Sequence, residues 1–185
     1  MRRPVHDAAL LDALQAMPAE RFDGTVWRVA RVGRDALTGS VGSGRWAPDD
    51  RSEILYTCLE RDGALSEVGF RLSLEPVWPS RLSHEIHALE ARANQTLRFA
   101  DVTSLVPLGV DAARWSGFDY VATQAVAAAT HFLEYDGMIV PSARAECANL
   151  VVFLDRAVGL AATHSEPVDW TVWRRAALMD KRRYP

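Results

Sequence analysis

Five polar or aromatic side chains stand within or at the ends of apolar segments of this sequence. They are Arg28, Arg45, Tyr56, Glu67 and Ser142. Arginine is suited to binding anions, because its planar guanidinium forms paired, charge-assisted hydrogen bonds with phosphate or carboxylate oxygens. A charged side chain inside an apolar strand must be paired or lie at a cleft, since burying it alone is costly. The pattern therefore predicts either a polar cleft or an internal ion pair.

The two alternatives are clearest for Arg28, which lies within the apolar run TVWRVARV at residues 25–32. One possibility is a structural ion pair between Arg28 and an acid such as Glu67. The other is a functional pair in a cleft, where charged groups with altered ionisation gather. Spacing alone favours the structural pair somewhat, and both alternatives stay open on these residues.

Arg45 lies in the stretch SGRWAPDD at residues 43–50, between a glycine and a proline. Glycine lets the backbone approach a ligand closely, and proline stiffens the exit from the turn. Arg45 is thus a candidate clamp for an anion, whereas taken alone it is equally a charge on an ordinary turn. We expect Trp46 to pack this loop onto the core and to frame the pocket.

Several other chemical signals are weak. His84 and His87 have the spacing of one helical face, but no third metal ligand accompanies them, so they are interpreted as solvated positions and no metal is expected. The glycines of TGSVGSG at residues 38–44 do not match a phosphate-binding fingerprint and predict a flexible loop. Ser142 lacks the GxSxG context of a hydrolase nucleophile.

Composition limits the class of protein. The chain has 185 residues, of which 49% are hydrophobic and 24% charged, which is typical of one globular domain. A net charge of −3 argues against direct binding of nucleic acid. Cys58 and Cys147 have neither metal spacing nor the density of a disulfide framework, and no run reaches the roughly 18 apolar residues of a membrane span. We expect a cytoplasmic protein that does not enter membranes.

The periodicity of apolar residues predicts a mixture of helices and strands. Helices are expected at residues 6–17, 64–72, 80–93 and 119–137. The helix at 80–93 is polar and is interpreted as a surface arm, and the helix at 119–137 has Asp119 as its expected N-cap and Gly137 as its expected end. Strands are expected at residues 25–32, 54–59, 97–102, 138–141 and 149–154, and the basic tail at 170–185 is interpreted as a solvated terminus or a weak docking segment. Without a long βαβ rhythm, the expected class is α+β.

The order of short motifs then suggests a family. VWRVA, SGRW, ILYTCLE, ALSEV, DYVATQAV, DGMIVPSAR and NLVVF follow one another from about residue 25 to residue 154. This series resembles the RES domain family, the toxins of RES–Xre type toxin–antitoxin pairs in bacteria. The resemblance implies a single RES-type domain over residues 1–185, with an ADP-ribosyltransferase-like core of mixed or antiparallel sheets surrounded by helices.

The resemblance also implies the site and its substrate. Family members act on NAD+, and the matched positions are Arg28, Arg45, Tyr56, Glu67, Ser142 and Asn149. The sequence departs from the family's GGRWN-like motif, because it has Ser43 and Ala47 where a glycine and an asparagine are common.

Each part of NAD+ calls for one of these residue types. The diphosphate requires arginine, so Arg28 and Arg45 are expected to bind it. The nicotinamide requires an aromatic face, which Tyr56 or Trp46 could supply. The ribose carbon C1 becomes positively charged as the glycosidic bond breaks, and Glu67 is the only acid among the matched positions that could stabilise it.

The remaining roles and partners follow from the same resemblance. Ser142 would orient the ribose or the nicotinamide amide, and Asn149 would also bind NAD+. The predicted catalytic residues are then Glu67, Arg28 and Tyr56. Water, phosphate or a protein side chain could each accept ADP-ribose, and the expected partner is an antitoxin with a helix-turn-helix DNA-binding domain. A catalytically silent module that binds a nucleotide or the antitoxin is the alternative.

Overall fold

A computed structural model describes residues 6–42, 44–47, 52–156 and 159–179. Parts of two predicted segments lie outside the described residues. These are Ser43 and residues 48–50 of the SGRWAPDD stretch, residue 51 directly after it, and residues 180–185 of the predicted tail. The α-helices are α1 (Ala8–Gln15), α2 (Arg61–Ser73), α3 (Val121–Phe132) and α4 (Trp170–Met179), with short 3₁₀ helices η1 (Val102–Leu108) and η2 (Ala112–Arg114). The strands are β1 (Ala19–Arg31), β2 (Ile54–Cys58), β3 (His84–Arg98), β4 (Gly137–Pro141), β5 (Ala148–Phe153) and β6 (Gly159–Pro167). The predicted α+β class is confirmed.

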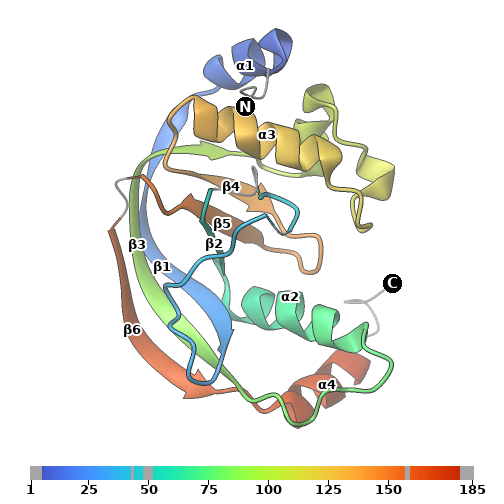
Figure 1. Cartoon of the computed structure of the whole chain (residues 1–185). Coiled ribbons are helices and arrows are strands. Elements are labelled where there is room, and N and C mark those ends of the chain that lie inside the picture. The colour runs from blue at the N-terminus through green and yellow to red at the C-terminus, as the bar shows by residue number, and fades with distance from the viewer. Residues whose placement is uncertain (1–5, 43, 48–51, 157–158, 180–185) are drawn as a thin grey trace.

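The strands form one mixed sheet that divides into two layers. β3 pairs with β1 along one edge, while its other edge pairs with β6 over Glu85–Arg92 and with β4 over Thr96–Arg98. β4, β5 and β2 continue from there as an antiparallel layer, and β2 returns to β1 through the single register pair Trp27 and Cys58. The long curved β1, β3 and β6 therefore lie beside the shorter layer in Figure 1.

Three apolar clusters hold these elements together. One lies between the two sheet layers and contains Val26 of β1 and Leu55 of β2. A second packs α1 and α3 against the sheet, with Leu14 and Trp46 buried in it. The third packs α2 and α4 against β1 and β3 around Trp170. Figure 1 shows the consequence, with α1 and α3 at one end of the sheet and α2 and α4 at the other.

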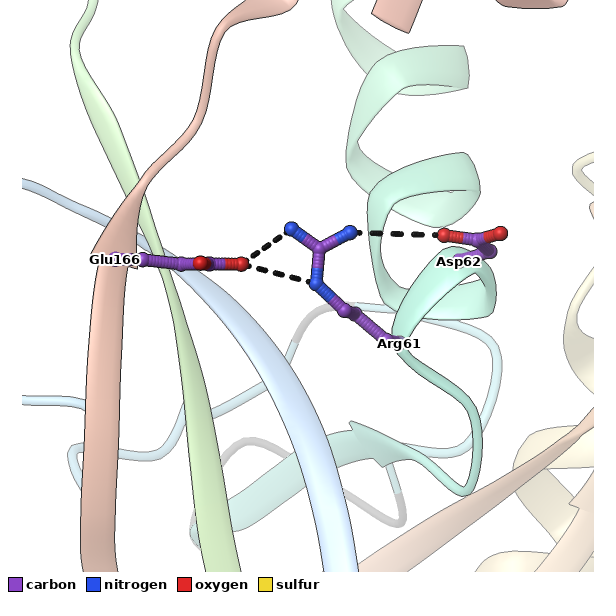
Figure 2. Close-up of polar contacts among 3 residues, drawn as sticks. All are labelled: Arg61, Asp62 and Glu166. Carbon is purple, nitrogen blue, oxygen red and sulfur yellow. Dashed lines mark hydrogen bonds and ion pairs between the residues drawn. The ribbon is translucent and has the colours of Figure 1, made fainter.

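The first turn of α2 is tied to β6 by an arginine. Arg61 Nε donates a hydrogen bond to Glu166 Oε1 over 3.0 Å, its Nη2 group donates to the same oxygen, and its Nη1 lies 3.7 Å from Asp62 Oδ1 (Figure 2). The guanidinium thus connects the helix to a strand more than a hundred residues further along the chain. This contact fixes the start of the helix that bears Glu67.

The predicted helical arm at residues 80–93 is wrong, because residues 84–93 belong to the long strand β3. Its sequence is rich in Glu, Ala, Leu and Arg, which favour a helix, but pairing on both edges of β3 overrides this local preference. His84 and His87 are correspondingly buried and not solvated, and the Nε1 of Trp170 donates to His84 Nδ1 over 3.1 Å.

The C-terminal tail is also more structured than predicted. Residues 159–167 form β6, which the sequence pattern did not indicate, and residues 170–179 form α4. Trp170 is only 8% exposed and contacts Trp78 and Trp173, so this segment belongs to the fold. Gly137 does not end the preceding helix, because α3 already stops at Phe132 and Gly137 begins β4.

The predicted strand at residues 97–102 is wrong beyond Arg98, because β3 ends there and η1 begins at Val102. The remaining predicted elements agree with the structure to within a few residues. The predicted helix at 6–17 is α1, and the predicted helix at 64–72 lies within α2. The predicted N-cap Asp119 is wrong by one residue, because the N-cap of α3 is Tyr120; Asp119 Oδ1 still accepts a hydrogen bond from the amide of Val121 over 3.4 Å.

Candidate functional site

A cavity of about 400 Å³ opens between the sheet, α2 and the loop at residues 44–47. The charged side chains that line it are five arginines and one glutamate: Arg28, Arg34, Arg45, Arg71, Arg144 and Glu67. This strong excess of positive charge contrasts with the net charge of −3 of the whole chain. The cavity is therefore suited to an anionic ligand with one group that faces a carboxylate.

Glu67 is held in a fixed position from the side of β4 and β5. Ser142 Oγ donates a hydrogen bond to Glu67 Oε1 over 2.6 Å, and Asn149 Nδ2 donates to the same oxygen over 3.2 Å. Among the contacts of the described residues, both hydrogen bonds to this carboxylate end on Oε1. The arrangement leaves Oε2 for a ligand in the cavity.

Ser142 lies directly behind this carboxylate. Its side chain is 9% exposed, and its oxygen also accepts hydrogen bonds from the amides of Arg144 and Ala145, over 3.0 and 3.2 Å. The turn after β4 thus fixes the hydroxyl, whose proton is directed at Glu67. The prediction that Ser142 orients the ribose or the nicotinamide amide stays a prediction, while its contact with Glu67 was not foreseen.

Arg28 reaches the cavity from β1. Its Nη2 donates to the carbonyl of Thr38 over 2.7 Å, and its buried Nη1 has no hydrogen-bond partner among the described residues. Burial, and to a smaller extent the nearby Arg34, lowers the pKa of Arg28 to about 10. Where the structure is described, the ion pair with Glu67 that the sequence left open does not form, so Arg28 is a cation with a donor available to a ligand.

Arg45 lines the cavity and contacts two aromatic rings. Its guanidinium carbon lies 4.4 Å from the ring centre of Trp115 and 4.8 Å from that of Tyr120. Its Nη2 donates to the carbonyl of Gly117 over 3.0 Å. Burial lowers the pKa of Arg45 below its ordinary value. The nearby Tyr120 raises this pKa and the nearby Arg144 lowers it further. The ring contacts fix the plane of the guanidinium, as a clamp for an anion requires.

Tyr56 anchors the loop that bears Arg45. The amide of Trp46 donates to its hydroxyl over 2.8 Å, and burial raises the pKa of that hydroxyl. Gly44 has a φ of 105°, and a Cβ placed there would lie 2.6 Å from the Tyr56 hydroxyl oxygen, so only glycine fits. Trp46 itself is 2% exposed, as expected of a residue that packs the loop onto the core.

The loop before this anchor is tied down in its described part. The carbonyl of Gly39 accepts from Arg34, its amide donates to Glu53, and Ser40 forms a β-bridge with Ile54. The prediction of a flexible loop at residues 38–44 is thus wrong for these residues. The sequence does not reveal this, because the partners lie on β2 and in the residues just before it.

Arg144 is a cavity residue that sequence reasoning missed. Its guanidinium carbon lies 3.7 Å from the ring centre of Phe70 on α2 and 5.5 Å from that of Phe118, and its Nη1 donates to the carbonyl of Ser116. Its place two residues after Ser142 in the motif MIVPSAR was the available signal. Arg34 and Arg71 had no such motif, and only the fold brings them to the cavity.

The predicted site residues therefore converge. Arg28, Arg45, Tyr56, Glu67 and Asn149 all line the cavity, and Ser142 contacts it through Glu67. Among the described residues, no group of three or more His, Cys, Asp or Glu side chains is placed to hold a metal ion. Within the same residues, no helix is long and apolar enough to cross a membrane.

This fold and this cavity define a class of α+β proteins with a cationic ligand site built around one carboxylate. A model of the RES domain matches residues 25–171, and the chain belongs to that family. It is similar in structure to a chain in the crystal structure of the M. tuberculosis MbcT-MbcA toxin-antitoxin complex. The two chains share 21% identity with a TM-score of 0.78, over 91% of this chain and 97% of that one. No curated protein matches the sequence.

Proposed function

We propose that this protein is the toxin of a bacterial type II toxin–antitoxin pair, and that it consumes NAD+ by cleaving the bond between nicotinamide and ribose. The observation that most supports this function is the fixed carboxylate of Glu67 in a cavity lined by five arginines. Membership of the RES domain family supports it, as does the similarity in fold to a chain of a toxin–antitoxin complex.

The arginines would bind the diphosphate of NAD+. Arg28 presents a buried Nη1 without a hydrogen-bond partner among the described residues, and Arg45 presents a guanidinium whose plane is fixed by two rings. A diphosphate would supply the acceptor oxygens that these donors need and would offset the mutual repulsion of the cations. Arg34 and Arg144 line the same cavity and would add to the field.

Tyr56 is the better of the two predicted aromatic contacts for nicotinamide. Both residues line the cavity, but Tyr56 is more exposed and is fixed through its hydroxyl, whereas Trp46 is only 2% exposed. A fixed ring would hold the nicotinamide in one plane and so set the direction in which it leaves.

Glu67 would stabilise the transition state. As the bond between nicotinamide N1 and ribose C1 breaks, its electron pair leaves with nicotinamide and positive charge develops at C1. A preorganised carboxylate stabilises such charge, and it can also orient a ribose hydroxyl or the incoming nucleophile. Ser142 and Asn149 hold Oε1, so Oε2 would face the substrate. The nucleophile then forms a bond to C1 and loses a proton.

The acceptor can be identified by mass spectrometry of cell extract incubated with the purified protein and NAD+ labelled in its ADP-ribose part. Free ADP-ribose would indicate water as acceptor, ADP-ribose 1″-phosphate would indicate phosphate, and a labelled polypeptide would indicate transfer to a protein. Binding of NAD+ without any of these products would contradict the proposal and favour a catalytically silent binding module.

A further inference from the structure

Beside Glu67 and Asn149, in the lining of the same cavity, lies a thiol that no proposed step yet uses. Cys58 ends β2 and is 4% exposed, and in the register of β2 and β5 it stands directly opposite Asn149. Directly paired residues of antiparallel strands direct their side chains to the same face of the sheet. The two side chains accordingly meet, with Cys58 Sγ 2.9 Å from Asn149 Oδ1.

The direction of this hydrogen bond determines how the amide of Asn149 lies. A thiol donates to the amide oxygen, so Oδ1 faces Cys58 and the Nδ2 group faces Glu67. If the amide turned over, its oxygen would face the carboxylate and repel it. The carboxylate of Glu67 and the thiol on β2 therefore favour the same orientation, in which Asn149 donates to Glu67.

The thiol can act in this way only while it keeps its proton. Its contact with the Cys147 side chain and its burial both raise the pKa of the Cys58 thiol above its ordinary value. Cys58 therefore keeps its proton at neutral pH. Because the same contact lowers the pKa of the Cys147 thiol, the Cys147 sulfur is a second acceptor for this proton beside Asn149 Oδ1.

We infer that Cys58 is a positioning residue, whose thiol fixes the amide of Asn149 so that the carboxylate of Glu67 is held with one oxygen toward the substrate. Cys58 lies on β2, Asn149 on β5 and Glu67 on α2. Their two hydrogen bonds thus connect the short sheet layer to the helix that bears the carboxylate. The effect on turnover rests on the proposed function, whereas the orientation of the amide does not.

The kinetic test compares Cys58→Ala, which removes the donor, with Cys58→Ser, which retains one. We expect Cys58→Ala to lower kcat for nicotinamide release about two- to tenfold, the range of one lost hydrogen bond, with KM for NAD+ unchanged. Cys58→Ser should restore most of the rate. In an Asn149→Ala background, Cys58→Ala should have no further effect, because the thiol then has no amide to orient.

A matched control separates this effect from general destabilisation. Thr96 is fully buried, and its hydroxyl donates to the carbonyl of Glu20 over 2.9 Å, away from the cavity. Thr96→Val removes a buried hydrogen bond and should leave kcat unchanged. Loss of rate in Thr96→Val, or an equal loss from Cys58→Ala with and without Asn149, would overturn the inference.

A second measurement does not depend on turnover. The side-chain amide resonances of Asn149 in a ¹H–¹⁵N spectrum, assigned by their loss in Asn149→Ala, should shift in Cys58→Ala and return toward their original position in Cys58→Ser. Resonances that Cys58→Ala leaves in place would overturn the inference. If the wild-type protein released no nicotinamide, the proposed function would fail, and these spectra alone would decide the role of Cys58.

Discussion

At the scale of single residues, the unusual feature is a partly buried cation that has no carboxylate partner among the described residues. Arg28 lies in a strand, hydrogen-bonded to the carbonyl of Thr38, with Arg34 near enough to lower its pKa further. Its folded pKa of about 10 is below the ordinary value of arginine, so the charge opposes folding at neutral pH. The free energy of unfolding therefore rises with pH only between the folded pKa of Arg28, about 10, and the ordinary pKa of arginine, where the folded protein releases the proton first. Such a cost is typical of a ligand site.

Replacing Arg28 by an uncharged side chain of similar length should therefore separate stability from function. We expect Arg28→Met to raise the melting temperature of the ligand-free protein by about 2–4 °C, the shift that about 1 kcal/mol produces in a protein of this size. The same variant should lose the stabilisation that NAD+ gives to the wild-type protein. Thermal unfolding with and without NAD+ measures both effects. A lower melting temperature in the ligand-free variant would count against an unpaired cation.

At the scale of elements, the position of Glu67 depends on α2, which is fixed at two places. Arg61 ties the first turn to Glu166 of β6, and the middle of the helix packs against α4. A Cβ built on Gly69 would lie 2.2 Å from the ring of Trp173, so glycine permits the close approach of the two helices. The segment that the sequence presents as a solvated tail thus supports the helix of the site.

The contact at Gly69 can be tested by adding one methyl group. Gly69→Ala should destabilise the protein by about 1–3 kcal/mol, because the ring of Trp173 must move away from α2. Denaturant unfolding measures this change. Gly24→Ala is the matched control, since a Cβ there meets only Phe22 at an ordinary distance of 3.8 Å. Equal stability of the two variants would show that α4 does not pack closely on α2.

The link between α2 and β6 should give the stability a dependence on acid pH. The hydrogen bonds and charge of Arg61 lower the pKa of Glu166 below 4.5. A carboxyl group with a lowered pKa stabilises the fold above its ordinary pKa and loses that contribution as the pH falls through the folded value. Glu166→Gln should therefore lower stability at about pH 6 and have less effect at about pH 3. Thermal unfolding at both pH values tests this, with Glu75→Gln on the exposed surface as control.

The sequence predicts elements well where local pattern and tertiary packing agree. The β-branched run at residues 25–32 and the apolar face of α3 were predicted because their environments match their periodicity. Residues 80–93 were assigned to a helix, since their helix-forming composition gives no sign of the two neighbouring strands that pair with β3. The matched motifs placed Arg28 and Glu67 in one site, but Arg34 and Arg71 lack any local signal and only the topology brings them there.

At the scale of the whole molecule, charge is unevenly distributed. The chain is acidic overall, with a net charge of −3, while five arginines surround one cavity. The negative net charge of the chain does not favour binding of DNA, which is itself an anion. The positive potential of the five arginines in the cavity favours a small anionic ligand. In a toxin–antitoxin pair, DNA binding would then belong to the proposed antitoxin with its helix-turn-helix domain.

The same cavity would offer the proposed antitoxin a place to block the ligand site. We expect an acidic side chain or the terminal carboxylate of the antitoxin to bind Arg28 or Arg45, because these present fixed cations at the cavity. Arg45→Ala should therefore weaken the complex at least about tenfold, as expected for loss of one buried charged contact. Calorimetry with the proposed antitoxin measures the affinity. Arg21→Ala, an exposed arginine on β1 that pairs with Asp23, is the control. Unchanged affinity in Arg45→Ala would contradict this mode of inhibition.

The most direct measurement is the rate of nicotinamide release from NAD+ by the purified wild-type protein and by Glu67→Gln. Glutamine keeps the size of the side chain and removes its charge, and Glu60→Gln at the exposed start of α2 is the matched control. We expect release by the wild type and by Glu60→Gln, and a rate at least about a hundredfold lower in Glu67→Gln, the usual loss for a preorganised charged group. Release by Glu67→Gln at the wild-type rate, or no release by the wild-type protein with cell extract and phosphate present, would contradict the proposed function.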